Sequence, residues 1–460
     1  MAGLTEYPFP RFAGGLNLRD QPDVVNPAQA IDLLDVTFTE RGAVRQRDGY
    51  GLFTSAVGAN RYDSLTAFSK TDGTRQIVAG AGNGLEALSS SGSVIASVAA
   101  TTGPHFFARF GGPSVEAVYA ANGTDQIRQW NGSAWSTPAW SGTAPTGRFV
   151  AVTQGDNRLV NARRSGTTAG DNPSTVRFSD PSTPTTFGAN NWVDLTPGDG
   201  EPIMGMVSWR EYLFVFKQSK FFVFGQTTDS GTGTPEFNYR PVDTGVGLCS
   251  SRALCATPFG VFFLTQRGVY LTDGGEPKLV SELLDPFWLG NASDFYRSNL
   301  FNHSALSAPV MAWHKQQVYL AVPTGGSTTN DRLLVYDPRY EWWSLWSLPC
   351  SGLVSFPADG RPELLFSLAA GTNDVGRHSS AYSKDDETPV AARWRSGWLD
   401  LDDPAVKSLR EGKVWGKGNV WVSYTKDYES STKQKLVAFG RGSDLWADGT
   451  DLGDVWGDGT

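Results

Sequence analysis

Short apolar runs joined by glycine or aspartate turns recur along the chain from about residue 62 to residue 370. The clearest example is Gly260–Thr265, which a Gln-Arg-Gly turn joins to a second apolar run at 269–272. Two β-rich runs separated by a glycine turn are typical of a β-hairpin. Comparable pairs are found at 77–79 with 85–88, 117–119 with 126–130, 159–160 with 176–178, 212–216 with 221–224, and 318–322 with 333–336.

The spacing of these hairpins favours a β-propeller. Units of roughly 40 to 50 residues with about four strands each correspond to propeller blades, and about six or seven blades fit this part of the chain. Each blade needs a neighbour to cover its apolar faces, so such a ring must close. Runs that are apolar at every position, such as 221–224, also suit an array of β-sandwiches. We predict an all-β fold with a propeller, and the sandwich array is the alternative.

The two ends of the chain lack this repeat. Asn26 and Pro27 precede a run that ends at Leu34, and a capping residue followed by proline predicts a short helix there. A second helical turn is predicted at 281–284, stopped by Pro286. The predicted parts are an extended N-terminal arm with a short helix (1–55), the β-propeller (56–388), a small antiparallel β domain (389–442) and a C-terminal extension (443–460).

The composition agrees with many short strands. Glycine (52), proline (26) and aromatic residues (12%) are frequent, whereas charged residues make up only 19%. The 39 basic and 47 acidic residues give a net charge of -8, which argues against a protein that grips nucleic acid with clustered Lys and Arg. No run approaches ~20 apolar residues and the N-terminus has no leader pattern, so we expect a soluble, unsecreted protein without a membrane segment.

Side chains that carry chemistry are few and scattered. The three cysteines, Cys249, Cys255 and Cys350, are expected to be reduced and buried. The four histidines lack the spacing of metal ligands or of a catalytic triad, and no complete turn box of the sialidase propellers is found. Asp-Gly turns near the C-terminus fit either hairpin turns or a calcium site. We therefore assign no catalytic residue, no cofactor and no metal ligand.

A series of motifs along most of the chain carries a resemblance to a known family. The motifs are Phe-Ala-Gly-Gly-Leu-Asn-Leu-Arg-Asp at 12–20, Arg-Gln-Arg-Asp-Gly-Tyr at 45–50, Ser-Asp-Pro at 179–181, Gly-Val-Phe-Phe-Leu-Thr at 260–265, Val-Tyr-Asp-Pro at 335–338, Trp-Trp-Ser-Leu-Trp at 342–346 and Arg-Trp-Arg-Ser-Gly-Trp-Leu-Asp-Leu at 393–401. In this order they resemble the tail hub or nozzle propellers of short-tailed bacteriophages, a class that includes packaged-DNA stabilisation and tail tubular proteins.

The resemblance implies a structural virion protein rather than an enzyme. Such a protein is made in the host cytoplasm and forms a ring in the phage tail, usually a homohexamer. Its expected partners are the portal and adaptor proteins of the head-to-tail connector and the tail fibre or needle proteins. Genome DNA would pass through the lumen without sequence-specific binding. The alternative is a glycan-binding or glycan-cleaving propeller used in host attachment.

Two groups of residues are candidates for contacts with neighbouring subunits. The N-terminal arm is locally basic in an acidic chain, which fits a subunit or adaptor contact or a solvated loop. Tryptophan is dense after Pro389, which fits either a core or an interface. The candidate interface residues are Arg11, Arg19, Arg41, Arg45, Arg47, Trp394 and Trp398.

Overall fold

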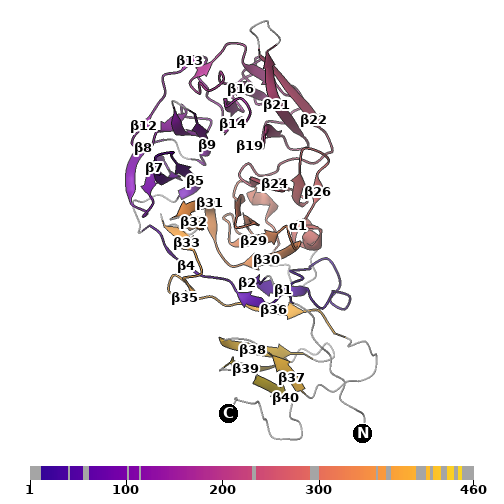
Figure 1. Cartoon of the computed structure of the whole chain (residues 1–460). Coiled ribbons are helices and arrows are strands. Elements are labelled where there is room, and N and C mark those ends of the chain that lie inside the picture. Colours follow the sequence, from indigo (N-terminus) through magenta and orange to yellow (C-terminus); the bar gives the residue numbers. More distant parts are fainter. Residues whose placement is uncertain are drawn as a thin grey trace. The chain divides into compact units, whose positions relative to one another are not determined.

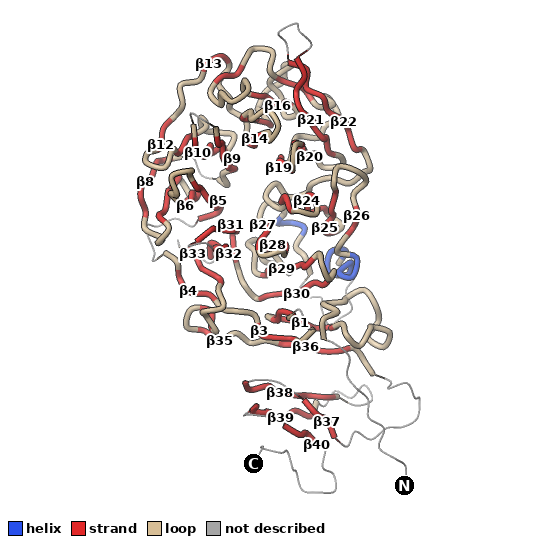
Figure 2. The backbone as a smooth tube through the Cα atoms, in the orientation of Figure 1, coloured by secondary structure: helices blue, strands red, loops and turns tan. Residues whose placement is uncertain are grey.

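The computed structural model describes residues 12–39, 42–54, 62–100, 103–112, 115–229, 235–290, 300–358, 361–368, 374–399, 411–414, 418–425, 432–439 and 444–447. The chain divides into two compact units, Met1–Leu399 and Asp400–Thr460. Figures 1 and 2 show the arrangement of the strands within the larger unit, where sheets stand side by side in a ring.

Six four-stranded antiparallel sheets are the first six blades of a propeller. Three of them are β5–β8 (Tyr62–Ser69, Arg75–Ala81, Gly84–Ser89, Val94–Ala99), β9–β12 (Phe106–Gly111, Glu116–Ala121, Arg128–Trp130, Trp135–Ser136), and β14, β15, β16 and β18 (Phe149–Val152, Leu159–Ala162, Thr175–Phe178, Trp192–Asp194). The next three are β19–β22 (Gly205–Trp209, Tyr212–Phe216, Phe221–Asp229, Pro235–Val242), β23–β26 (Leu254–Thr257, Gly260–Thr265, Gly268–Thr272, Lys278–Leu279), and β27–β30 (Val310–His314, Gln317–Val322, Arg332–Asp337, Trp342–Trp346).

The seventh blade joins the two ends of this unit. Its six strands lie in the order β31 (Cys350–Ala358), β32 (Arg361–Leu368), β33 (Val375–His378), β4 (Tyr50–Leu52), β34 (Lys384–Asp385) and β35 (Thr388–Pro389). The fourth strand, β4, comes from the N-terminal part of the chain and pairs antiparallel with β33. The first strand of this blade, β31, lies against β5 of the first blade, so the ring is closed. The predicted propeller is confirmed, with seven blades.

The core lies between neighbouring blades. Val78 of the first blade and Trp130 of the second belong to one buried cluster, and Val160 and Val215 join the third and fourth blades in another. All six positions of β24 are buried, which explains why its sequence is apolar without alternation. Each blade is therefore stabilised by the two beside it, as the repeat predicts.

The helix predicted at the N-terminus is wrong. The side chain of Asn26 does accept a hydrogen bond from the Ala28 N–H at 2.9 Å, as the capping pattern requires. The chain then continues as the strand β1 (Ala30–Leu34), because β36 (Arg393–Ser396) pairs with it along its length. Tertiary pairing overrides the local helix signal.

The prediction that Pro286 stops a helical turn is also wrong, because this proline lies at the start of a helix. A 3-10 turn (Glu282–Leu284) passes directly into the short helix α1 (Asp285–Leu289), with the proline in its first turn. A first-turn proline is tolerated because its missing N–H would have no partner in the helix.

The remaining short elements lie outside the four-stranded sheets. The strand β2 (Val36–Phe38) pairs with β3 (Val44–Gln46), β13 (Ser141–Gly142) pairs with β17 (Thr186–Phe187), and a further 3-10 turn covers His303–Ala305.

The described residues of the smaller unit form two strand pairs. They are β37 (Glu411–Val414) with β40 (Asp444–Ala447), and β38 (Gly418–Tyr424) with β39 (Lys433–Phe439), both antiparallel. The small β domain predicted at 389–442 includes residues 393–396, but these residues form β36 in the larger unit. The structure therefore places the division between the units at residue 399, ten residues after Pro389.

The three cysteines are buried and free, as expected. Burial raises the pKa of the Cys249 thiol to about 12, so it stays protonated near neutral pH. In the described part of the chain, no helix is both long and apolar enough to span a bilayer.

Candidate functional site

Residues 12–39 and 42–54 are called here the N-terminal segment, and the part of it around residues 15–36 runs along the outer strand of the sixth blade. The Leu16 N–H donates to the Trp343 carbonyl at 2.9 Å, and the Asp35 N–H donates to the Leu345 carbonyl at 2.8 Å. The indole N–H of Trp346 and the hydroxyl of Ser344 both donate to the Val36 carbonyl, at 2.9 and 2.6 Å. The segment is thus fixed to β30 by its backbone.

A glycine allows the segment to approach β30 closely. Gly15 has a φ of 74°, and a Cβ at this position would lie 2.7 Å from the Cβ of Trp342. Both the left-handed conformation and the contact exclude a larger residue. This is the structural reason for the second glycine of the Phe-Ala-Gly-Gly-Leu-Asn motif.

Arg47 ties the segment to the seventh blade from the inside. Its side chain is 0% exposed and forms ion pairs with Asp35 at 2.6 Å and with Asp385 at 2.5 Å. Its guanidinium also faces the ring of Trp346 at 5.7 Å. Burial lowers the pKa of Arg47, but the hydrogen bond to Asp385 and the charge of Asp35 outweigh it and the net pKa is raised.

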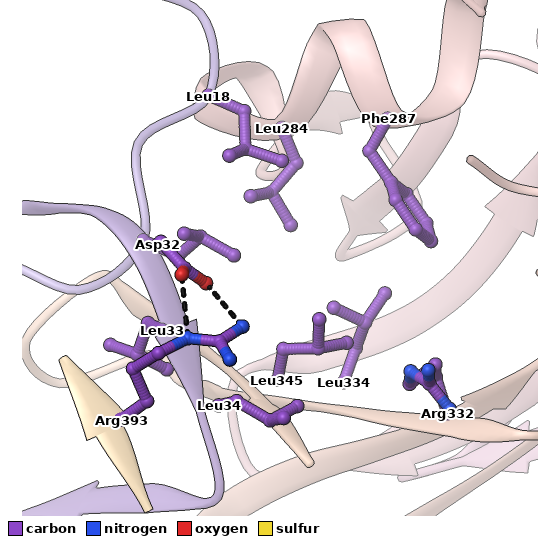
Figure 3. Close-up of a pocket in the computed structure, with 11 residues that line it drawn as sticks. Leu18, Asp32, Leu33, Leu34, Leu284, Phe287, Arg332, Leu334, Leu345 and Arg393 are labelled. Atoms are coloured by element: carbon purple, nitrogen blue, oxygen red, sulfur yellow. Dashed lines mark hydrogen bonds and ion pairs between the residues drawn. The ribbon is translucent and has the colours of Figure 1, made fainter. Parts of the chain in front are cut away.

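A cavity of about 140 Å³ lies beneath the N-terminal segment, between β1, α1 and the outer strands of the sixth blade (Figure 3). One wall carries a bidentate ion pair, in which the Arg393 guanidinium contacts the Asp32 carboxylate at 2.6 and 3.0 Å. The remaining lining is mostly aliphatic. The lining residues are Leu16, Leu18, Asp32, Leu33, Leu34, Leu284, Phe287, Arg332, Leu334, Leu345 and Arg393.

The size and the lining of this cavity suit the binding of a small apolar group. Apolar cavities of about 150 Å³ hold a group of the size of benzene. Arg393 has a side chain that is 59% exposed, so a charged group is present beside the apolar lining. Among the described residues, no group of His, Cys, Asp or Glu side chains is placed to hold a metal ion. The site therefore suits one apolar side chain.

The predicted interface residues differ in their exposure and in their ion pairs. Arg19 is 41% exposed and pairs with Asp20 and Glu282 at 3.1 and 2.6 Å, beside the cavity-lining Leu18. Arg45 is exposed and pairs with Asp48. Arg11 and Arg41 lie outside the described residues.

The interface prediction is wrong for Arg47, because its side chain is enclosed within its own chain.

Trp394 and Trp398, the two tryptophans of the predicted interface, lie in or beside the β1–β36 pair that forms part of the cavity. Trp394 stands opposite Leu33 in the β1–β36 pair, and its ring meets Phe12 edge to face at 4.9 Å. The Trp398 N–H donates to the Pro22 carbonyl at 2.7 Å. Both are half-buried.

Sequence reasoning missed the residues that define the cavity. Asp32 and Arg393 are 361 positions apart, and nothing local pairs them. The available signal was the apolar content of 16–18 and 33–34, which the helix prediction assigned to a different geometry.

Comparisons with known proteins assign no activity to this chain. No protein-family model and no curated protein matches the chain. Among solved structures, it is similar to a streptogramin B lyase structure, at 12% identity and a TM-score of 0.45 over 72% of this chain and 98% of that one. It is also similar to the β-propeller domain of Cps50 (Swd1) of Myceliophteria_thermophila, at 8% identity and a TM-score of 0.44 over 71% of this chain and 99% of that one. At these values neither an activity nor a partner is transferred.

Proposed function

We propose that the protein is a structural subunit of a short-tailed bacteriophage tail. In this role copies of the chain form a ring, hexameric in the families that it resembles, which surrounds the DNA channel, joins the connector to the distal tail and retains packaged DNA. The observation that supports this most is the N-terminal segment. It carries the first motifs of the resemblance, and it is fixed to the closed propeller while leaving a binding cavity.

The propeller itself gives little reason for assembly. A closed ring of blades satisfies its own sheet edges, so contacts with other subunits fall on parts outside the blades. The layer formed by β1 and β36 is such a part, and it combines an apolar cavity with the exposed Arg19 and Arg393. An apolar anchor surrounded by charged groups is a common form of protein interface.

A substitution that fills the cavity tests this proposal. Leu18 is half-buried at the cavity wall, and Leu18→Trp would place an indole in the space that a neighbour would occupy. We expect the variant to keep the circular dichroism spectrum of the wild type but to be missing from purified virions, whose heads then lose DNA. The matched control is Ile95→Trp, at a 42% exposed position on β8. Normal incorporation of the Leu18 variant, or absence of the wild-type chain from virions, would contradict the proposal.

A further inference from the structure

Arg148 and Arg163 face each other beside the first strand of the third blade, and neither has an acidic partner among the described residues. Phe149 pairs with Ala162 at the start of the innermost strand, β14, so Arg148 and Arg163 are the next opposite positions. The Arg148 N–H donates to the Arg163 carbonyl at 3.2 Å. Like charges directly opposite each other on antiparallel strands are destabilising.

The surroundings do not compensate these charges. Both arginines are half-buried, and within the described residues neither forms an ion pair or a side-chain hydrogen bond. Burial lowers the pKa of both guanidinium groups, and the charge of Arg148 lowers the pKa of Arg163 further. No carboxylate contributes to either shift. Both groups still carry their charge at neutral pH.

Aromatic rings are the main contacts of the pair. The Arg148 guanidinium lies 5.5 Å from the ring of Phe106 and 5.8 Å from that of Phe149, and the Arg163 guanidinium lies 6.0 Å from the Phe149 ring. These distances are near the limit at which a cation–π contact stabilises, about 0.5–1 kcal/mol for an exposed pair. An unpaired, partly desolvated charge costs more than this.

The local backbone is also strained. Arg163 has a φ of 58°, a left-handed conformation that costs a non-glycine residue energy and is concentrated at functional sites. Behind Arg148, the loop at Gly123 (φ 83°) comes so close that a Cβ there would lie 2.9 Å from the Arg148 Cβ. The arginine stem is thus packed from one side while its buried Nε has no hydrogen-bond partner.

From this geometry we propose that Arg148 and Arg163 bind an oxyanion, the carboxylate or phosphate group of a small ligand, beside Phe106 and Phe149. Guanidinium groups bind both anions bidentately, and the bound anion cancels the repulsion between the two arginines. The site lies on the third blade, apart from the cavity beneath the N-terminal segment, and does not depend on a role in a phage tail.

Calorimetric titration of the full chain with sodium phosphate and with sodium glucuronate tests this site, against sodium chloride at equal ionic strength. We expect saturable binding of at least one oxyanion, and the preferred anion identifies the ligand group. Arg148→Gln and Arg163→Gln should each weaken it by about tenfold or more. In chloride, both variants should melt at or above the wild-type temperature, because the repulsion is gone.

The matched control is Arg210→Gln. Arg210 also has a positive φ, 53°, and its guanidinium lies 4.4 Å from the ring of Trp209, but it lies in the turn between β19 and β20, where its neighbour is Glu211 rather than a second arginine. Binding should be unchanged in this variant. The proposal is overturned if neither oxyanion binds the wild type saturably, if the Arg210 variant loses binding equally, or if Arg148→Gln melts lower in chloride and binds as before.

Discussion

The guanidinium of Arg47 lies between two carboxylates that come from opposite ends of the larger unit. Asp35 precedes it by 12 positions, and Asp385 follows it by 338. Asp35 is itself buried and also accepts the Ser347 N–H at 2.8 Å. This one side chain therefore joins the N-terminal segment to the outer strands of the seventh blade.

Arg47→Met should destabilise the protein strongly. The substitution leaves the buried Asp35 carboxylate without its cation, which costs about 3–5 kcal/mol. The control is Arg45→Met, which removes only an ion pair with Asp48 on a side chain that is 54% exposed, a loss of about 1 kcal/mol or less. Urea denaturation of both variants measures the two losses. Equal losses would contradict the role given to Arg47.

The buried histidines make stability depend on pH. Burial lowers the pKa of His105 to about 4, against opposing contributions from Asp125 and the Gly103 backbone. In the unfolded chain this imidazole takes up a proton below about pH 6.5. Its contribution to stability is therefore complete above pH 6.5 and is lost as the pH falls towards 4.

His105→Gln should reduce this pH dependence. Between pH 7.5 and pH 5 the wild type should lose roughly 2 kcal/mol more unfolding free energy than the variant, because a full difference of one proton is worth about 1.36 kcal/mol per pH unit. Comparing the two proteins cancels the titration of the carboxylates that they share. Parallel stability curves from pH 7.5 to pH 5 would show that His105 titrates normally in the folded state.

At the residue scale, the sequence predicts a property that follows from the residue type alone better than one that depends on distant partners. The cysteines could be assigned to the interior because their chemistry favours burial at any position. Arg47 could not, since a basic residue in a polar stretch is normally solvated and its burial depends on two distant carboxylates.

At the scale of elements, the seventh blade depends on the three residues of β4. The strand lies between β33 and β34, and Gly49 directly before it lets the chain pass Lys384. A Cβ on Gly49 would lie 1.9 Å from the Lys384 carbonyl oxygen, and the other nearest atoms belong to the same backbone. Neither Gly49 nor the Lys384 backbone can move away without shifting a strand.

Gly49→Ala should therefore disturb the closing blade. We expect a loss of about 1–3 kcal/mol, the usual cost of forcing an extra carbon into a packed site. The matched control is Gly111→Ala at the end of β9, where an added Cβ meets no atom within 4 Å. That variant should stay within about 0.5 kcal/mol of the wild type. Thermal unfolding of the Gly49 and Gly111 variants tests whether closure of the seventh blade limits stability. Equal losses in the two variants would contradict this.

Hairpins were predictable from the sequence, whereas the strands that close the fold were not. The hairpin Gly260–Thr265 with Gly268–Thr272 is encoded in adjacent residues, and the structure contains it as predicted. The strand β1 is encoded only through its pairing with residues 393–396, so a local capping pattern misassigned it. The short strand β4 gives no signal of its own, because its partners lie at 376–378.

For the whole molecule, ring closure is reinforced near the axis. Arg252, directly before the fifth blade, donates to the Ser307 and Ala308 carbonyls at 3.0 and 2.9 Å and to the Ser351 carbonyl at 2.9 Å, and it also reaches the Asp63 carbonyl. These groups belong to the sixth, seventh and first blades. The propeller is thus tied into one body that can carry a binding surface on its outside.

The repeat spacing predicts this architecture. The position of the N-terminal segment bears on how assembly through the chain ends can be tested, because removal of residues 1–20 would do more than remove a subunit contact. Leu16 is buried and bound to Trp343, so this deletion would also remove part of the core. Single substitutions at the cavity separate assembly from folding better than truncation does.

The most direct test of the proposed phage-tail role is electron cryo-microscopy of phage particles released by cells that carry the gene for this chain. The proposed function predicts a ring of seven-bladed propellers around the DNA channel below the portal, with density for neighbours on the N-terminal segment and β36. Virions without this chain, or a propeller present as an isolated copy away from the channel, would contradict it.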